Sequence, residues 1–527
     1  MPAFAAPGEF DPAFGQNGIA TVPTTGRSVA NFVTTDGAGR VLATGLAAPA
    51  SVGNEGFGQL EFIARMLANG NQDPSFNGSG AILSPPTPVS ESGALYFGHQ
   101  GMSLLPAAGG WLAIRAEDWY CPFPVVCSAN YLPKITGRKF NNEGSIDPFY
   151  GPALLGSGNS AAQLLPDPDG GVTMISTGPE GFQGTSHNTT VQRITANGQP
   201  DKNFNEAMSG TLGCRLLAEE DGRRSSAKML RLSDGKLLLA QGIELNPNAA
   251  FRLRVPTPSP HRVCISRFNA DGTVDASYAN NGDLLLDSLI FTFAQNAPVA
   301  LLPLPSGGAA LVIQKTYPPA NGSGSAYLIV WLNADGVLDA SRNFGQGYAG
   351  LTSLHVAVVT AAAIQPDGKI ILAGYPDSRP GTNPQQIDYS QPVVGRLHQL
   401  GGNDLTFGIG RQGFIPLISF GKRLIPNHLH IADDGSIFVA GAVANGAHVP
   451  NEFTQFAVGK LQGDPLPVAP VPSQGGGGGC GITRDSRIDP TLPGLVLLAF
   501  LAFGTRRWRG GQRANSSTDG PFQAQTS

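Results

Sequence analysis

Short apolar runs alternate with Gly, Asn and Asp along most of this chain. Each run holds four to six residues rich in Val, Ile, Leu and Ala and follows a glycine, which is typical of a buried β-strand. Seven such runs occur in order: Gly39–Gly45, Gly110–Ile114, Gly171–Ile175, Gly235–Ala240, Gly308–Ile313, Gly368–Gly374 and Gly435–Gly441. Asp-Gly before several of them predicts a tight hairpin turn, because glycine adopts a positive φ at no steric cost.

A second pattern has the same period. In Ile265–Tyr278 an apolar stretch ends in Asn-Ala-Asp-Gly, an Asp follows three places after the glycine, and an aromatic residue comes three places later. Its Asp recurs at Asp11, Asp73, Asp147, Asp201, Asp275, Asp339, Asp404 and, more weakly, Asp464. Successive positions differ by 62, 74, 54, 74, 64, 65 and 60 residues, so the chain holds seven units. Because every unit has it, we expect this Asp to accept hydrogen bonds from turn N–H groups rather than to form seven active sites.

A unit of about 60 residues holds roughly four short antiparallel strands, which is one blade of a β-propeller. The chain begins with half a unit, Phe10–Gly18, and the strand Thr454–Leu461 near its other end supplies the missing half. Pairing of these ends would hide two sheet edges. The sequence therefore predicts an all-β chain, with a seven-bladed propeller of four-stranded antiparallel blades over residues 8–464 that is closed by its N- and C-terminal strands.

Composition limits the possible partners. The chain has 70 glycines and only 14% charged residues, which suits many turns and few helices. Its net charge is −4 and it has no basic stripe, so we expect no nucleic-acid partner, which would need clustered Lys and Arg.

Candidate catalytic and metal-binding residues are few. No serine nucleophile elbow, His-Glu-x-x-His zinc motif or phosphate-binding glycine loop is present, so we predict no catalytic residue, cofactor or metal. His428 and His430 would share one face of a strand and could pair on a metal, but they have no third ligand nearby and we expect ordinary polar positions. Asp167, Asp169 and the Asn269–Asp275 stretch have spacings similar to calcium ligands, without the twelve-residue loop and its closing Glu.

Two further groups remain open. Glu219–Arg224 combines two acidic and two basic residues and indicates a solvated loop. Trp111, Trp119 and Tyr120 could form an aromatic binding patch at one mouth of the ring, although core packing of Trp111 is an equal alternative.

The five cysteines fall into two pairs and one remainder. Cys121 and Cys127 flank an insertion in the second unit, and Cys214 and Cys264 belong to one unit. Each pair could be a disulfide in an exported protein if the Cα atoms lie about 4.4–6.8 Å apart, or two free buried thiols. Cys480 is left over.

These repeats resemble the delta-60 repeat family. Phe10–Gly15 fits its Leu-Asp-x-x-Phe-Gly element, and Gln365–Gly374 fits its Asp-Gly-Lys strand. The resemblance covers most of the chain and implies a propeller-like surface protein of unknown ligand.

The two ends of the chain indicate its location. Met1–Pro7 has no basic start and no apolar core, but Ala-Phe-Ala is similar to the end of a signal-peptide cleavage site, so we expect a leader upstream. Residues 465–479 predict a Pro/Gly-rich linker. Residues 480–509 hold Cys480, a hydrophobic segment and an Arg cluster. We expect the hydrophobic segment to form a short helix, shorter than the ~20 residues that span a bilayer. Residues 510–527 predict a disordered polar tail.

The segment 480–509 resembles bacterial C-terminal sorting signals of the JDVT-CTERM, GlyGly-CTERM and MYXO-CTERM types. The resemblance implies an intramembrane protease as partner, with Gly479 and Cys480 as the processing and lipid-attachment position. The polar extension after residue 509 departs from that pattern. The alternative is a plain glycine linker followed by a C-terminal membrane helix.

The sequence therefore predicts an exported propeller, anchored at the bacterial cell surface or outer membrane or released after processing. We expect a non-enzymatic module that binds an unknown protein or glycan, or a structural spacer. Its variable surface would be Ala47–Gly58, Cys121–Pro133, Asn246–Pro260 and Pro376–Gln391. The alternative is a surface glycan lyase or hydrolase in the channel. Polar or charged side chains there would favour an enzyme, and Gly, Ala and Val would favour binding.

Overall fold

A computed structural model describes most of the repeat region. The described residues are 6–24, 26–47, 60–83, 95–107, 109–120, 134–147, 153–157, 163–179, 187–204, 222–245, 261–286, 295–317, 324–343, 346–350, 356, 358–376, 391–408, 410, 412–445 and 454–464. The chain divides into units 1–467 and 468–527, and every described residue belongs to the first unit. The predicted C-terminal helix lies outside the described residues. Within them, no helix is long and apolar enough to cross a membrane.

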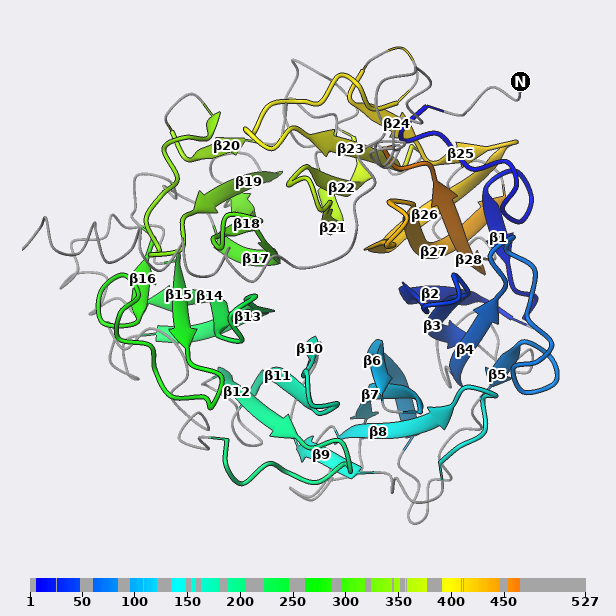
Figure 1. The fold of residues 1–527 in the computed structure, drawn as a ribbon, viewed down its shortest axis with the longest axis horizontal. Coiled ribbons are helices and arrows are strands. Elements are labelled where there is room, and N and C mark those ends of the chain that lie inside the picture. Colours follow the sequence, from blue (N-terminus) through cyan, green and yellow to red (C-terminus); the bar gives the residue numbers. More distant parts are fainter. Residues whose placement is uncertain are drawn as a thin grey trace, which may run out of the picture. The chain divides into compact units, whose positions relative to one another are not determined.

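Seven antiparallel sheets surround a central axis, as the sequence predicted (Figure 1). We number these sheets as blades 1–7. The first strand of each blade lies innermost and contacts the first strand of the next blade all the way round. These seven inner strands are β2, β6, β10, β13, β17, β21 and β26. The prediction of a seven-bladed β-propeller is confirmed.

The first four blades contain fifteen strands within the described residues. Blade 1 contains β2 (Ser28–Thr35), β3 (Val41–Ala47), β4 (Leu60–Met66) and β5 (Ala81–Leu83). Blade 2 contains β6 (Leu95–Ala107), β7 (Gly110–Tyr120), β8 (Lys134–Asn141) and β9 (Ala153–Ser157). Blade 3 contains β10 (Gln163–Pro166), β11 (Val172–Pro179) and β12 (His187–Ile194). Blade 4 contains β13 (Gly222–Arg231), β14 (Leu237–Leu245), β15 (His261–Phe268) and β16 (Asp283–Leu285).

The remaining strands complete the ring. Blade 5 contains β17 (Gln295–Pro303), β18 (Ala309–Tyr317), β19 (Gly324–Leu332) and β20 (Tyr348–Gly350). Blade 6 contains β21 (Val358–Ile364), β22 (Ile370–Tyr375), β23 (Val393–Leu397) and β24 (Phe414–Pro416). Blade 7 contains β25 (Ile418–Ser419), β26 (Lys422–Ile431), β27 (Ile437–Asn445), β28 (Thr454–Leu461) and, from the N-terminus, β1 (Ile19–Thr21). The seven apolar runs read from the sequence are the second strands.

Blade 7 joins the two ends of the repeat region. β1 pairs antiparallel with β28, with Ile19 opposite Gly459. Phe10 forms an isolated antiparallel bridge to Leu461, and the Asp11 N–H donates to the Lys460 carbonyl. The predicted closure is therefore confirmed.

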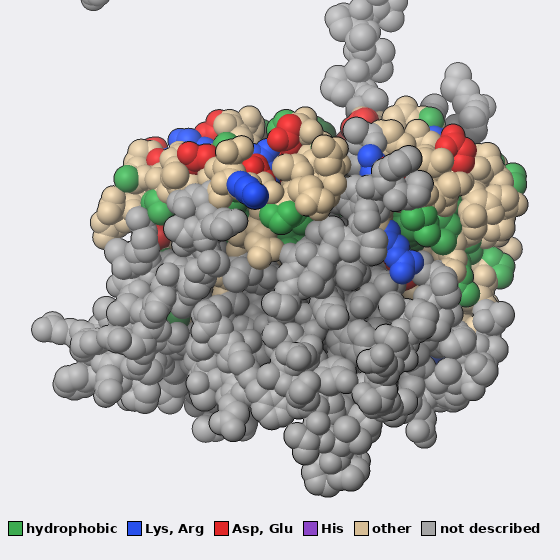
Figure 2. All heavy atoms as spheres, turned by 90° about the horizontal axis from the view of Figure 1, so that it is seen from below, with side chains coloured by type: hydrophobic (Ala, Val, Ile, Leu, Met, Phe, Trp, Pro, Cys, Tyr) green, Lys and Arg blue, Asp and Glu red, His purple; other side chains and the backbone are tan. Residues whose placement is uncertain are grey.

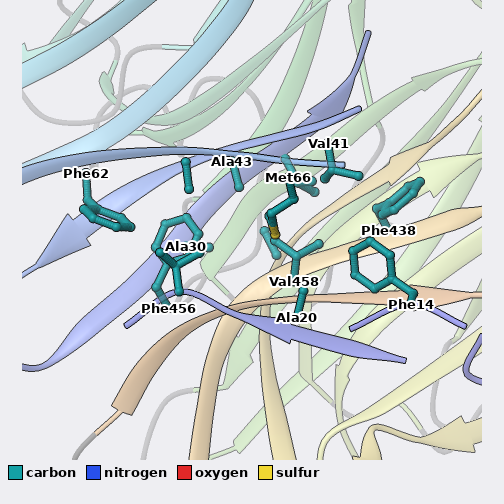
Figure 3. Packing of buried hydrophobic residues seen from close by; sticks show 14 of the residues in the cluster. Phe14, Ala20, Ala30, Val41, Ala43, Phe62, Met66, Phe438, Phe456 and Val458 are labelled. Carbon is teal, nitrogen blue, oxygen red and sulfur yellow. The ribbon is translucent and has the colours of Figure 1, made fainter. Parts of the chain in front are cut away.

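The hydrophobic core lies between adjacent blades because the strands are buried on both faces. In β3, Val41 packs in the cluster shared with blade 7, while Leu42, one residue on, packs in the cluster shared with blade 2. Side chains alternate between the two faces of a strand, so a continuous apolar run is needed to fill both contacts. The cluster between blades 7 and 1 packs Phe62 against Phe456 with ring centroids 5.0 Å apart (Figure 3).

Candidate functional site

The ring has two unlike faces. The turns from the first to the second strand are short, and they lie at the same face as the longer connections from the third to the fourth strand. We call this face the turn face. Connections from the second to the third strand, and from one blade to the next, leave the opposite face, which we call the connection face. All four segments predicted as variable surface join second to third strands, so all four begin and end at the connection face. Apart from their end residues they lie outside the described residues. Figure 2 shows acidic and basic side chains interspersed on the described surface.

The repeated Asp builds the turn face. Its Oδ1 accepts a hydrogen bond from the backbone N–H two residues on, at Ala13, Ser75, Asn203, Ser277, Ser341 and Thr406. The predicted turn role is therefore confirmed.

The other carboxylate oxygen of the repeated Asp binds a cation that the sequence analysis missed. A Lys or Arg eight residues earlier, on the third strand, pairs with it at Arg65–Asp73 (2.7 Å), Lys139–Asp147 (3.6 Å), Arg193–Asp201 (3.3 Å), Arg267–Asp275 (2.7 Å) and Arg396–Asp404 (2.8 Å). Lys460 and Asp11 form the same pair, at 3.0 Å, across the joined ends in blade 7. The signal was present in the sequence, since the basic residue has the same period as the Asp. Blade 5 differs because Trp331 occupies this place.

This pair also links neighbouring blades. Arg65 is buried, donates to Asp73 and to Ser75, lies 4.8 Å above the Phe76 ring, and contacts the Asn142 carbonyl of blade 2. Arg267 does the same in blade 4 and reaches the Ala334 carbonyl of blade 5 at 2.5 Å. Burial opposes ionisation of Asp73, but hydrogen bonds from Ser75 and the charge of Arg65 outweigh it and lower the pKa of Asp73.

A backbone hydrogen bond reinforces the same contact. The residue four places after the repeated Asp donates its N–H to a turn carbonyl of the next blade, in the pairs Gly15–Asn69, Asn77–Glu143, Ala279–Asp335, Asn343–Leu400 and Gly408–Pro7. Each of these donors has a positive φ. At the turn face, these ion pairs and backbone hydrogen bonds therefore hold neighbouring blades together.

The inner strands carry a recurring irregularity. β-Bulges interrupt the pairing of the first with the second strand in six of the seven blades, for example between Pro426 and His428. In blades 1, 6 and 7 a glycine of the second strand lies opposite the bulge, and a Cβ at Gly441 would lie 1.7 Å from the Ile425 carbonyl oxygen. Gly45 and Gly374 are in the same situation. The glycine that ends several apolar runs is therefore required by close approach of the inner strand.

Polar side chains connect inner strands at two contacts between blades. We call such a contact a seam. At the 3/4 seam, the Gln163 amide donates to the Met229 carbonyl and accepts from the Met229 N–H. At the 7/1 seam, His428 Nδ1 accepts from the Val33 N–H at 3.4 Å, and the His428 ring lies 4.3 Å from that of Phe32. Burial, followed by the charge of His430, lowers the pKa of His428 to about 3.

The two histidines thus share one side of β26, as predicted. His430 Nε2 lies 2.9 Å from the Thr35 hydroxyl, and burial lowers its pKa. Both rings are used to join blade 7 to blade 1. The described residues contain no group of three or more His, Cys, Asp or Glu side chains placed to hold a metal.

The seven inner strands have an unusual charge composition. Within their bounds there is no Asp or Glu, although the chain has 38 acidic residues. They do contain Lys and Arg, on two strands only: Arg223, Arg224, Lys228 and Arg231 on β13, and Lys422 and Arg423 on β26. The prediction that Arg223 and Arg224 lie in a loop is wrong, because β13 begins at Gly222 and both residues belong to this strand.

The other predicted site residues have separate outcomes. Trp111 is 5% exposed and packs between blades 1 and 2, so core packing is confirmed for it, while the side chains of Trp119 and Tyr120 lie outside the described residues. Cys264 is buried on β15 and is disulfide-bonded. Its predicted partner Cys214 lies outside the described residues, as do Cys121, Cys127, Gly479 and Cys480, so both pairings and the sorting position stay predictions.

Known proteins share the fold of this chain at low similarity. No protein-family model and no curated protein matches the chain. A solved ulvan lyase, a polysaccharide lyase, is 10% identical over 84% of this chain and 95% of its own, with a TM-score of 0.45. An α-L-arabinofuranosidase from Fusarium graminearum is 11% identical over 69% and 92%, with a TM-score of 0.34. The NanB sialidase from Streptococcus pneumoniae is 9% identical over 84% and 70%, with a TM-score of 0.37. These likenesses show the fold alone.

One prediction is corrected here. The sequence analysis predicted a protein that is not an enzyme because it found no catalytic motif. That prediction is not kept: a polysaccharide lyase, an arabinofuranosidase and a sialidase are among the solved chains just named. The physical reason is that a ring brings side chains from different blades to one channel, so a site there need not leave a contiguous motif.

Proposed function

We propose that this protein is an enzyme that acts on an acidic glycan, a lyase or a hydrolase, at the mouth of its central channel on the connection face. The observation that carries the proposal is the inner wall, which has six Lys or Arg positions and no carboxylate within the seven inner strands. A concave wall of one charge sign attracts a ligand of the opposite sign. The excess is local, because the whole chain has a net charge of −4.

The connection face is the better place for the site. Side chains and backbone groups of the turn face are engaged in the Arg–Asp pairs and in the hydrogen bonds that link blades. The connections between strands at the other face vary in length from blade to blade, and ligand-binding residues occur disproportionately on such segments.

The wall favours elimination over hydrolysis. Hydrolysis of a glycosidic bond ordinarily uses two carboxyl groups about 5–9.5 Å apart, and the inner strands provide none. Elimination at a uronate needs a base that removes the proton next to the carboxylate, and donors or cations that stabilise the enolate as the glycosidic oxygen leaves. The channel wall has the cations for this step. The base would come from the connection face.

The test is a comparison of substrates. The full chain would be incubated with acidic polysaccharides containing uronate, with sulfated polysaccharides and with neutral ones of similar length. We expect new ultraviolet absorbance from the unsaturated uronate product together with new reducing ends, on uronate substrates alone. Reducing ends without absorbance would establish hydrolysis instead. Cleavage of neutral glycans only, or no cleavage of any acidic glycan, would contradict the proposal.

We also propose that the enzyme is exported and held at the cell surface. Support comes from the sequence, in which the propeller 8–464 is followed by a linker, a cysteine and a basic-flanked hydrophobic segment. Replacing Cys480 with Ser should move the protein from the membrane fraction to the medium or to an unprocessed precursor. An unchanged distribution would argue against lipid attachment there.

A further inference from the structure

Lys228 is a basic residue of the inner wall that has no hydrogen bond or ion pair among the described residues. It lies three residues before the turn-face end of β13, opposite Ala240 of β14, which belongs to the cluster shared with blade 5. Its side chain therefore points to the 4/5 seam, as that of Leu230 does two residues later. β14 covers one edge of β13, and blade 5 covers the face on which the lysine lies. The open edge is the channel, so the channel is where the partly exposed amine meets solvent.

The equivalent residues of two other blades show what this position ordinarily does. Gln163 and His428 each lie four places before the turn that ends their inner strand, as Lys228 does, and each binds backbone of the next inner strand. An amide or a neutral imidazole can accept a hydrogen bond from an edge N–H, whereas an ammonium group only donates. A lysine at this position therefore cannot accept the hydrogen bond from that backbone N–H, as Gln163 and His428 do.

No carboxylate of the inner strands is available to neutralise Lys228. Arg231 on the same strand binds Asp167, and Lys422 on β26 donates to Gln16 at 3.1 Å. Among the described residues, Lys228 has no hydrogen bond or ion pair. Burial lowers its pKa, which means that its charge is held in a poorly solvated place. Burying an unpaired charge costs free energy, so an anionic partner would stabilise the protonated amine.

We propose that Lys228 binds an anionic group of the glycan in the channel, and that this group is a sugar carboxylate. This inference rests on the proposed function and names the residue that selects acidic substrates. The amine is desolvated in the free protein and has no ion pair among the described residues. The carboxylate of the ligand would supply the missing negative charge. The residue is a binding residue and need not take part in bond cleavage.

Titration calorimetry with a uronate oligosaccharide would test this on the full chain, with a sulfated neutral oligosaccharide and an uncharged one as comparison probes. Lys228→Met keeps the length and removes the charge, and we expect it to weaken uronate binding about tenfold or more. Lys228→Arg should stay within about threefold of the wild type, because it keeps the charge. Lys202→Met is the matched control, and we expect less than about a twofold change because Lys202 is exposed at the turn face, outside the channel wall.

Thermal unfolding separates binding from structure. Lys228→Met should raise or leave unchanged the unfolding temperature without ligand, because it removes a desolvated charge. A lower temperature, unchanged uronate affinity, or an equal loss in Lys202→Met would overturn the assignment. Tighter binding of the sulfated probe than of the uronate would overturn the choice of carboxylate. If the wild type binds and cleaves no acidic glycan, the proposed function fails; if it does so and Lys228→Met does so equally well, only this inference fails.

Discussion

Removing one buried arginine should open one specific contact between blades. Arg65 is 1% exposed, and it neutralises Asp73, which is 3% exposed, across 2.7 Å. In Arg65→Met the Asp73 carboxylate keeps its turn bonds to Ser75 and the more distant Arg40, at 3.9 Å, but loses its close counter-ion and the link to the Asn142 carbonyl. Breaking one side of a buried pair costs about 3–5 kcal/mol. We expect most of that loss at the contact between blades 1 and 2.

Hydrogen exchange measures this locally. The Asn77 N–H, which donates to Glu143 across the same contact, should exchange about two to three orders of magnitude faster in the variant. Arg342→Met in blade 5 is the control, because Arg342 bonds an Asp only three residues away and more exposed, and it should cost about 1 kcal/mol. Since the pKa of Asp73 is lowered in the fold, its contribution is present above about pH 3.8 and fades as the pH falls through the folded value, so the two proteins should converge in acid. Equal effects of the two variants, or faster exchange spread evenly over all blades, would refute the reasoning.

Three other substitutions probe the ring. Gly441→Ala places a Cβ 1.7 Å from the Ile425 oxygen and should lower the free energy of unfolding by about 2–3 kcal/mol in denaturant titration, whereas Gly402→Ala, with nothing within 4 Å, should change it by less than about 0.5 kcal/mol. Ala279→Asn should raise it by about 0.5–1 kcal/mol, because this position has a φ of 43° and two other blades use Asn there; a loss would contradict that argument. Burial lowers the pKa of His428 to about 3, so the wild type should lose stability as the pH falls from about 6.5 towards 3, and His428→Gln should show a flatter profile in melts across that range; parallel profiles would count against it.

The sequence was sufficient for the fold because a closed ring repeats its physical requirements in every blade. The second strands must fill the contacts on both of their faces, which forces the continuous apolar runs such as Val41–Ala47. The turns must bond their own N–H groups, which fixes an Asp in each unit. The same logic identified the joining of Phe10 with Leu461, since half a unit stood at each end.

The links between blades were less visible because they connect residues that sequence spacing does not bring together. Arg65 and Asp73 are eight residues apart within one blade, but the Asn142 carbonyl that Arg65 also contacts belongs to the next blade. The loop prediction for Arg223 and Arg224 failed for a related reason. Two basic residues beside two acidic ones suggest a surface, and no local pattern shows that a strand begins between them.

Function in such a ring should be sought where a blade departs from its neighbours. A residue present in every blade is explained by the ring itself, as the repeated Asp is. The position of Lys228 is occupied by Gln163 in blade 3 and by His428 in blade 7, and in both cases the side chain bonds the next inner strand. An unpaired lysine at this position loses solvation of its amine and forms no hydrogen bond to the next inner strand. The contact between blades therefore does not explain its presence. That argument needs the register of the strands and the seam partners, which is why it could not be made from the sequence, and why Lys228 rather than any repeated residue is the first to substitute.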